Sequence, residues 1–490
     1  MSKLDFEYVP LTFINDKEEI KKQIKNTLIL IHLIEKYKQP VRLENLIEGT
    51  QYGYNASALQ SGRNKFLRIS DIHESKVNWE TVPYCNCDDE KTYLLKKDDI
   101  LIARTGGTTG KSFKIDNPPA HSIYAGYLIR IRAKQEVSPD YIYLFLHSFA
   151  YWSQIVNLNE RNFRPKANAE NLKSLILPDC PSDIQNDAVK ISNGELVKGY
   201  EELYSAIEKA LTEYDKTQEV QKLLSDQLTQ LENLNQAILQ EAVQGKLVNQ
   251  DQKDEPASEL LKRIKAEKAK SGKKEKPLPP IKPEEIPFEI PENWVWCRLG
   301  ELFDIERGSS PRPKGDPRYF SKVKTPFHWI TISDMTAYAQ DKPLSDTREF
   351  LTELGTKHSR YVTTKDIIIV ASGSAGRTSL LGIEGYIYDG LMSVKNIPDE
   401  SMKHFLFYLF KIFEANMMKL ATGATWQNIN TDILKNQPVP VPPLSEQKRI
   451  VAEIEKQLAK TKQLKEHIIA NQQATEQLLK ALLHEAFEVN

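Results

Sequence analysis

The sequence contains one long internal repeat. The run LLKKDDILIARTGGTTGKSFKI at 94–115 returns as YVTTKDIIIVASGSAGRTSLLGI at 361–383, which aligns Asp99 with Asp366. A repeat of about half the chain length predicts two copies of one domain, and two copies predict that two equivalent things are held at once. The function is therefore expected to be a paired one.

The repeat extends beyond this run. FLRISDI at 66–72 answers HWITISDM at 328–335, and YAGYLIR at 124–130 answers YDGLMSV at 388–394. After a shared pair of prolines, both copies enter glycine-poor, charge-rich stretches with apolar residues at steps of three and four. This periodicity predicts long helices.

Apolar or neutral residues alternate by threes and fours along both stretches, which predicts one continuous seam on each helix. A helix of about 40 residues would be roughly 60 Å long, more than one small domain can cover. We therefore expect the two helices to pack antiparallel as a spacer of fixed length. The expected seam positions are Val220, Leu224, Leu228, Leu231, Leu234 and Ile238 in the first copy, and Ile450, Ile454, Leu458, Thr461, Leu464, Ile468, Asn471, Thr475, Leu478 and Leu482 in the second.

The first helical region is longer than the second. Pro178 and Pro440 are 262 positions apart but Ala237 and Ala481 only 244, so the first copy carries 18 additional residues. Eighteen residues are close to five helical turns, so continuous helix and a looped-out insertion are equally consistent with the sequence. The first copy also has Cys180 where the second has a proline, which predicts a different geometry at the start of its helical region.

The linker after the first helical region links the two copies in the middle of the chain. This linker, residues 247–298, is similar in length to residues 1–42, which occupy the corresponding place if the C-terminus is imagined joined to the N-terminus. The repeat is therefore expected to be circularly closed, with the termini near each other. The linker holds a basic helical piece followed by a proline-rich run. We expect it to be mobile and solvated, with contact between DNA and the cluster at 262–276 as the alternative.

Composition excludes several classes of protein. No run of eighteen apolar residues exists and the first residues lack the pattern of a signal peptide, so a soluble, cytoplasmic chain is expected. The 4 cysteines are too few and scattered for a disulfide framework or paired metal ligands. The net charge of −1 neither indicates nor excludes a nucleic-acid partner, because basic residues can gather on one face.

Local charge is more informative. A stretch of the second copy, 306–326, carries six Arg and Lys against one Glu and one Asp, and the first copy places basic residues beside tyrosines at the comparable position, 52–68. Arg, Lys, Ser and Asn are the groups that bind phosphates and read base edges. A solvated basic loop would explain either stretch alone, but the recurrence at one place in both copies favours DNA.

Two motifs resemble catalytic signatures without completing them. TGGTTGKS at 105–112 lacks the first glycine of a phosphate-binding loop and is followed by a strand-like segment, so we interpret it as a tight turn between strands. NPPA at 117–120 lacks the aromatic residue of an adenine methyltransferase motif. The 9 histidines do not recur in register, and no hydrolase motif is found. The sequence indicates a binding protein and not an enzyme.

Almost the whole chain resembles the specificity subunit of a type I restriction-modification system. The marks are PVPPLSEQKRIVAEIE at 440–455, QAILQEAVQGKLV at 236–248, DEPASELLKRIKAEK at 254–268 and IPENWVWCRLGEL at 290–302. The resemblance implies two target-recognition domains that each read half of a bipartite DNA site in the major groove, separated by antiparallel helices that set the unread gap. It also implies that two modification (methyltransferase) subunits dock on the helices and carry the restriction subunits. S-adenosylmethionine, ATP and magnesium would then belong to those partners, with no cofactor, catalytic group or metal in this chain.

The expected fold class is α+β, with two pseudo-repeated α/β target-recognition domains joined by two long antiparallel helices as a coiled coil in a pseudo-two-fold circular arrangement. A duplicated protein-binding scaffold and an NTP-dependent enzyme are the alternatives. The expected organisation is an N-terminal helical segment at 1–40, a first target-recognition domain at 41–180, a helical region at 181–250, a linker at 251–297, a second target-recognition domain at 298–443 and a C-terminal helix at 444–490.

The residues expected to contact DNA lie in the duplicated polar loops. Arg104, in a turn after a strand, suits guanine, and Gln427 suits adenine. The first-domain candidates are Arg63, Asn64, Lys65, Arg104, Thr105, Thr108, Thr109, Lys111, Arg161 and Arg164, and the second-domain candidates are Arg307, Ser309, Arg312, Lys314, Ser372, Ser374, Arg377, Trp426 and Gln427.

Overall fold

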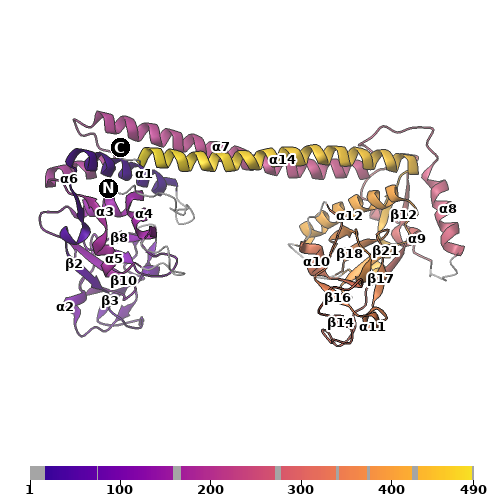
Figure 1. The fold of residues 1–490 in the computed structure, drawn as a ribbon, viewed down its shortest axis with the longest axis horizontal. Helices are drawn as coiled ribbons and strands as arrows, with labels where there is room; N and C mark the ends of the chain where they lie inside the picture. The colour runs from indigo at the N-terminus through magenta and orange to yellow at the C-terminus, as the bar shows by residue number, and fades with distance from the viewer. Residues whose placement is uncertain are drawn as a thin grey trace. The chain divides into compact units, whose positions relative to one another are not determined.

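The structure is a computed structural model that describes residues 17–73, 76–157, 167–270, 277–337, 342–371, 376–421 and 429–487 (Figure 1). The chain divides into two compact units, one of residues 1–224 with 471–490 and the other of residues 225–470. Each unit contains one copy of the repeat. The last part of the chain belongs to the same unit as the first part, as the expected circular closure requires.

The first unit is built on a four-stranded antiparallel sheet. Its strand order is β2 (Ile47–Tyr52), β10 (Leu128–Ala133), β7 (Ile100–Ala103) and β8 (Ser112–Lys114). All four residues of β7 are buried, which explains why its sequence is a continuous apolar run.

The second unit repeats this sheet strand for strand. The order is β13 (Asp304–Arg307), β21 (Leu391–Lys395), β18 (Ile367–Val370) and β19 (Thr378–Leu380). β18 is again buried at all four positions. The predicted duplication of one α/β domain is therefore confirmed by topology as well as by sequence.

Each unit also has a second sheet that contains one parallel strand pair. In the first unit, β3 (Asn64–Leu67) lies between β6 (Tyr84–Cys85) and β9 (Ser122–Tyr124), and β3 pairs in parallel with β9. In the second unit β15 (His328–Ile330) pairs in parallel with β20 (Gly385–Ile387). Three further strands complete that sheet: β14 (Phe320–Ser321), β16 (Glu349–Leu351) and β17 (Arg360–Val362).

The two copies share individual hydrogen bonds. The carboxylate of Asp99 accepts from the backbone N–H of Lys96 at 2.9 Å, and that of Asp366 accepts from Thr363 at 2.8 Å. The copies also share a Ser-Asp sequence, at 70–71 and 333–334. Its aspartate, Asp71 or Asp334, accepts a backbone hydrogen bond from the residue three positions earlier in both copies. These aspartates repeat because they fix turns of the scaffold.

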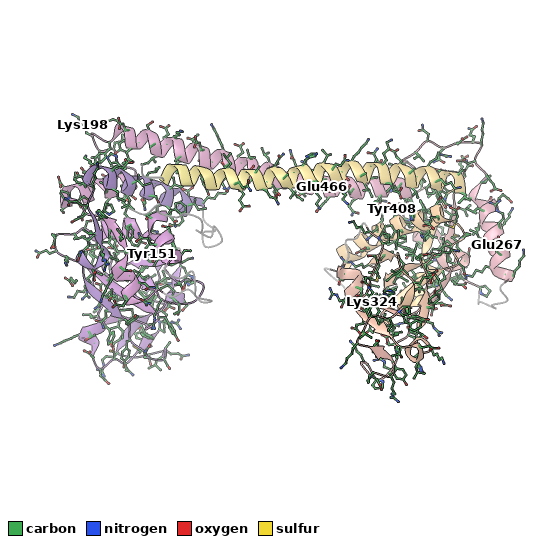
Figure 2. The ribbon with its side chains drawn as sticks, in the orientation of Figure 1. Tyr151, Lys198, Glu267, Lys324, Tyr408 and Glu466 are labelled. Atoms are coloured by element: carbon green, nitrogen blue, oxygen red, sulfur yellow. The ribbon has the colours of Figure 1, made fainter. Side chains whose placement is uncertain are left out.

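Helices cover the sheets and contribute most of the two large cores. Tyr151, labelled in Figure 2, is fully buried in the first of these cores. The helices of the first unit are α1 (Lys17–Tyr37), α2 (Glu90–Tyr93), α3 (Pro139–Leu146), α4 (Phe149–Asn157), α5 (Ala169–Ser174) and α6 (Ser182–Ser192). Those of the second are α8 (Ala257–Lys270), α9 (Leu299–Leu302), α10 (Ile332–Ala337), α11 (Glu353–Thr356), α12 (Glu400–Ala421) and α13 (Thr431–Asn436).

Short strand pairs close each domain where its chain enters and leaves. β1 (Pro40–Arg42) pairs with β11 (Ile176–Pro178), and β12 (Val295–Arg298) pairs with β22 (Pro438–Val441), both antiparallel. β4 (Ile72–His73) pairs antiparallel with β5 (Lys76–Val77).

The start of the helical region has the same geometry in both copies. The side-chain amide of Gln185 donates to the carbonyl of Cys180 at 2.9 Å, and that of Gln447 donates to Pro442 at 2.8 Å. The expectation of a different geometry in the first copy is therefore wrong. A backbone carbonyl accepts this bond, so the exchange of cysteine for proline leaves it intact.

The 18 additional residues of the first copy do not extend one continuous helix, because the helical region is interrupted at 193–200. α6 ends at Ser192, and the long helix α7 (Glu201–Val243) begins only at Glu201. Gly194 and Gly199 lie in the intervening turn with φ of +91° and +92°, a region that favours glycine. As a result α7, with 43 residues, and α14 (Leu444–Phe487), with 44, have nearly equal lengths.

Within the second unit, α7 and α14 pack antiparallel. Thr461 Oγ1 donates to Asn235 Oδ1 at 2.6 Å, and Lys465 Nζ lies 3.8 Å from Glu232 Oε1, so a later residue of α14 meets an earlier residue of α7. The seam differs in part from the expected one. Among its expected members Thr461 is buried, whereas Leu234 and Leu464 are exposed by 47% and 52% because the contact face passes through Asn235 instead.

The linker helix α8 is part of the second unit and is not a solvated tether, so that expectation is wrong over 257–270. Three of its side chains, Ala257, Leu260 and Ile264, enter the core. Four of the five cations of α8 form contacts inside the unit, which disfavours DNA contact for them, while residues 271–276 of the predicted basic cluster lie outside the described residues. The pairs are Lys262 with Glu259, Arg263 with Glu255, Lys265 with Glu301, and Lys268 with the carbonyl oxygens of Gly300 and Phe303.

Candidate nucleic-acid interface

The motif resembling a phosphate-binding loop is the turn between β7 and β8, as predicted. Gly106 and Gly110 take φ of +86° and +85°, and the flanking strands pair antiparallel. The turn is fixed on α4, since the Tyr151 hydroxyl donates to the Gly110 carbonyl at 2.7 Å. A Cβ on Gly110 would lie 2.9 Å from the Trp152 ring, so this glycine is also required sterically. The turn is thus a rigid platform at the sheet edge.

Arg104 occupies the base of this turn and is held by aromatic contact. Its guanidinium carbon lies 4.8 Å from the ring centroid of Tyr52, and its backbone N–H donates to the Tyr127 carbonyl at 2.9 Å. Tyr127 itself is 68% exposed. A guanidinium held beside a ring in this way still has N–H groups to donate, and bidentate donation from arginine is the commonest specific contact with guanine.

The other candidates around the turn divide by exposure. Lys111 is exposed and Thr105 and Thr108 are half-buried. Thr109 is buried, with its hydroxyl donating to the Gly106 carbonyl at 2.8 Å. Thr109 therefore shapes the turn and has little surface for a ligand.

The neighbouring candidates on β3 are mostly structural. Asn64 is fully buried, accepts from the Cys87 N–H at 3.1 Å and donates to the His121 carbonyl, so it does not reach the surface. Lys65 donates to the Val82 carbonyl at 2.9 Å. Only Arg63 of this group has an exposed side chain. Arg161, Arg164, Ser372, Ser374, Trp426 and Gln427 lie outside the described residues.

In the second domain, Asp389 organises the basic stretch at 306–326, which we call the basic loop. Its carboxylate accepts from Arg312 Nη2 at 2.7 Å, its carbonyl accepts from Arg307 Nε at 2.8 Å, and its N–H donates to Ser310 Oγ at 3.2 Å. Sequence reasoning missed this residue. The available signal was its position in the repeat, where YDG in the second copy replaces YAG in the first and only the second carries an acid.

Several cations of the same region are neutralised locally. Arg318 donates to Asp316, which lowers the pKa of that carboxyl, and Lys324 pairs with Asp346 at 2.7 Å. Arg377 is half-buried beside Glu414, and Ser309 donates to the His358 carbonyl. Lys314 and Lys322 are exposed, and neither forms an ion pair with another residue that the structure describes.

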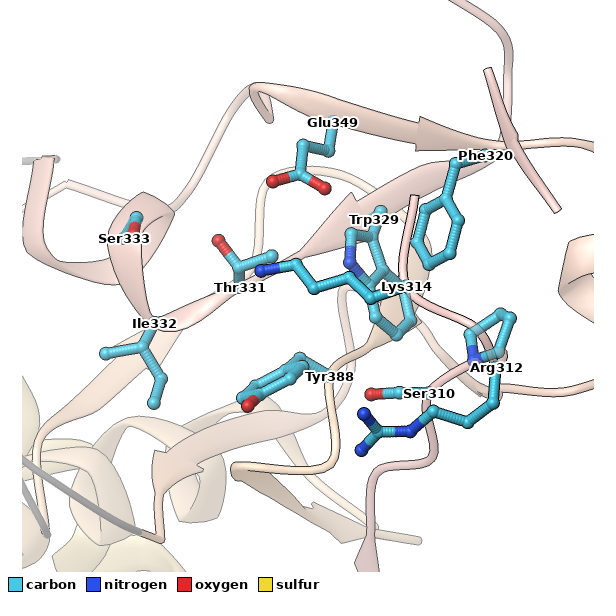
Figure 3. A pocket seen from close by; sticks show the side chains of 11 residues that line it. Ser310, Arg312, Lys314, Phe320, Trp329, Thr331, Ile332, Ser333, Glu349 and Tyr388 are labelled. Atoms are coloured by element: carbon cyan, nitrogen blue, oxygen red, sulfur yellow. The ribbon is translucent and has the colours of Figure 1, made fainter. Parts of the chain in front are cut away.

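The basic loop borders a pocket of about 240 Å³ (Figure 3). Figure 3 shows Lys314 and Arg312 extending from the loop beside the rings of Trp329, Phe320 and Tyr388. The pocket lies against the five-stranded sheet, whose strands β15 and β16 supply Trp329 and Glu349. Cationic, aromatic and carboxylate groups are thereby brought together from segments distant in sequence.

Within the part of the chain that the structure describes, no three His, Cys, Asp or Glu residues are grouped as metal ligands. None of the described helices is long and apolar enough to cross a membrane.

Fold and surfaces together define a duplicated binding protein, in which a common scaffold carries two different polar surfaces. The family model described as type I restriction modification DNA specificity domain matches residues 39–192 and 291–471. The two matches cover more than half of the chain and coincide with the two copies of the repeat. The chain belongs to this family.

Individual relatives agree with this assignment. The chain is 30% identical over 268 residues to the type I restriction enzyme EcoEI specificity subunit of Escherichia coli, which covers 51% of this chain and 44% of that protein. It is 64% identical over 80 residues to the EcoAI specificity subunit of Escherichia coli, covering 15% of this chain and 14% of that protein. The matched part thus spans less than half the length of either relative.

A solved structure shares the fold along nearly the whole chain. It is described as the structural basis of complex assembly and conformational transition of the type I R-M system. The TM-score is 0.55 at 18% identity, over 92% of this chain and 97% of that one.

Proposed function

We propose that this chain is the DNA sequence-recognition subunit of a type I restriction-modification complex. Each domain reads one half of a bipartite, gapped DNA site. The observation that carries the proposal is the contrast between scaffold and loops. The aspartates at 99 and 366 make the same bond, whereas Asp389, which holds the second basic loop, replaces the Ala125 of the first copy.

The two domains read through different groups. In the first, Arg104 supplies a bidentate donor, with Lys111 and Arg63 as phosphate contacts. In the second, Arg312 and Lys314 on the basic loop are the main donors. Because the groups differ, the two half-sites differ in sequence.

The helices α7 and α14 set the length of the gap and dock two modification subunits, through which the restriction subunits join. Their nearly equal lengths, 43 and 44 residues, support a spacer common to both halves. This chain is non-catalytic in the proposal. S-adenosylmethionine, ATP and magnesium act on the partner subunits.

Co-expression with the cognate modification subunit, followed by modification-sensitive sequencing of the host DNA, tests the proposal. The expected result is one split motif with a constant gap. If a stable complex forms and no sequence is modified, the chain is instead a duplicated protein-binding scaffold.

A further inference from the structure

The pocket beneath the basic loop has walls suited to a flat ring. The Phe320 and Trp329 ring centroids are 5.9 Å apart, and those of Trp329 and Tyr388 are 6.3 Å apart with their planes perpendicular at 90°. Trp329 is only 2% exposed and forms the fixed back of the pocket, so the aromatic surface open to a ligand comes from the half-buried Phe320 and Tyr388. Stacking on such rings binds any nucleobase, because every base has a π-face.

The size of the pocket favours a single base. Pockets for drug-sized ligands span roughly 300 to 1,000 Å³. At about 240 Å³, this pocket is below that range and has no room for two stacked bases with their sugars. Bases inside a duplex are stacked and paired on both sides, so a base can enter such a concavity only after leaving the helix.

Two charged side chains give the pocket chemical selectivity. Glu349 extends from β16 and Lys314 from the basic loop (Figure 3), and among the described residues neither forms an ion pair. A carboxylate accepts from the exocyclic amine of cytosine or adenine and repels the carbonyl oxygen that thymine presents instead. Lys314, with Arg312 and Ser310 nearby, is suited to the attached phosphate.

The corresponding positions of the first domain are occupied differently. Tyr124, the counterpart of Tyr388, is fully buried, and Arg68 stands where Thr331 lines the pocket. The Arg68 guanidinium is bonded to Asp71 at 2.7 Å. The pocket residues are therefore among the features in which the second domain differs from the first.

We propose that this pocket binds one unpaired nucleotide of the target DNA, an adenine or a cytosine, whose exocyclic amine stands where guanine and thymine carry a carbonyl oxygen. The base packs against the Phe320 and Tyr388 rings and donates its amine to Glu349, while Lys314 binds the phosphate. This inference rests on the proposed function, because the DNA that supplies the nucleotide is the half-site read by the second domain. A free nucleotide has the same chemistry and is distinguished by experiment.

The test uses the full-length chain with two sets of probes. The first is dAMP, dCMP and dTMP, and the second is a duplex with a single bulged adenine, cytosine or thymine beside the same duplex fully paired. We expect dAMP and dCMP to bind about tenfold more tightly than dTMP, the effect of one hydrogen bond to a charged group. Bulged adenine and cytosine should strengthen duplex binding by a similar factor, whereas bulged thymine should not.

Variants connect these effects to the pocket. Glu349→Gln should remove the preference for adenine and cytosine, and Lys314→Ala should weaken binding of all three nucleotides. Lys322→Ala is the matched control, since it removes an exposed loop cation that does not line the pocket. Ser333→Trp should block the pocket, with Ser333→Ala as its control.

Equal affinity for the three nucleotides, or no binding at all, would overturn the inference. Preferential binding of free dAMP and dCMP without any gain from the bulges would overturn the assignment to DNA. Neither result affects the proposed function, which is tested separately by the split modification motif. Conversely, selective bulge binding by a chain that directs no modification would contradict the proposed function alone.

Discussion

The carboxylate of Asp389 lies 2.7 Å from Nη2 of Arg312, a residue 77 positions earlier in the chain. The pair joins the basic loop to the turn before β21. Arg312 remains 69% exposed, so the contact orients the guanidinium without removing it from solvent.

Replacement of Asp389 by alanine, the residue of the first copy, should release this orientation. We expect the modified motif to become degenerate at positions of the second half-site while the first half-site stays unchanged. Stability should change by less than about 1 kcal/mol, since exposed ion pairs contribute little. Modification-sensitive sequencing and thermal denaturation provide the two measurements. An unchanged motif would show that Asp389 has no part in recognition.

Arg104→Ala should cost about 1 to 3 kcal/mol of discrimination at one base pair of the first half-site. Lys111→Ala, at the same turn, serves as the comparison, because loss of a phosphate contact weakens binding to all sequences equally. Competition binding with single-base variants of the site measures both. If Arg104→Ala weakened every sequence to the same extent, Arg104 would be a phosphate contact only.

The two glycines of the β7–β8 turn should differ in their tolerance of a side chain. Both have positive φ, so either replacement by alanine should cost on the order of 1 to 2 kcal/mol in backbone strain. Gly110→Ala should cost a further amount of about 1 to 3 kcal/mol, because its Cβ would lie 2.9 Å from Trp152 whereas that of Gly106 meets nothing within 4 Å. Denaturant unfolding of the two variants gives the difference, and equal stabilities would contradict the contact with α4.

Acid should weaken the contact between the linker and the second domain. Arg298 is buried and holds Glu285 at 2.7 Å, which lowers the pKa of that carboxyl to about 2. A depressed folded-state pKa means that the stabilisation is complete above the unfolded pKa of about 4.3 and is lost as the pH falls toward 2. The melting temperature of the wild-type chain should therefore fall more steeply than that of Glu285→Gln over this range. Parallel curves would exclude this linkage.

The scaffold was largely predictable because its signals are local or repeated. The glycines and following strand pattern of TGGTTGKS predicted a turn, and the repeat predicted two equal domains. Whether the 18 additional residues form continuous helix or a looped-out insertion was not predictable, because 18 residues are close to five whole helical turns and fit both alternatives. The glycines at 194 and 199 decided for a break through their backbone conformation.

The candidate site was less predictable, because exposure and long-range pairing decide it. Asn64 and Arg63 are adjacent polar residues, yet the first is buried at the start of β3, where its side chain bonds to the Cys87 N–H and the His121 carbonyl, and the second is exposed just before the strand. The Asp389 contact and the pocket around Trp329 join loops and strands distant in sequence, which no local pattern specifies. Leu464 and Thr461 show the same limit on the helices, where the polar residue is the buried one.

The central claim is that each domain reads its own half-site independently. Exchange of one domain for the other tests this claim most directly. A chimera in which residues 298–443 replace residues 41–180 would be co-expressed with the modification subunit beside the wild-type chain, and modified sites would be read by sequencing. Independent reading by each domain predicts that the chimera modifies a gapped, inverted repeat of the second half-site. A chimera that assembles with the modification subunit yet retains the wild-type first half-site would contradict the account.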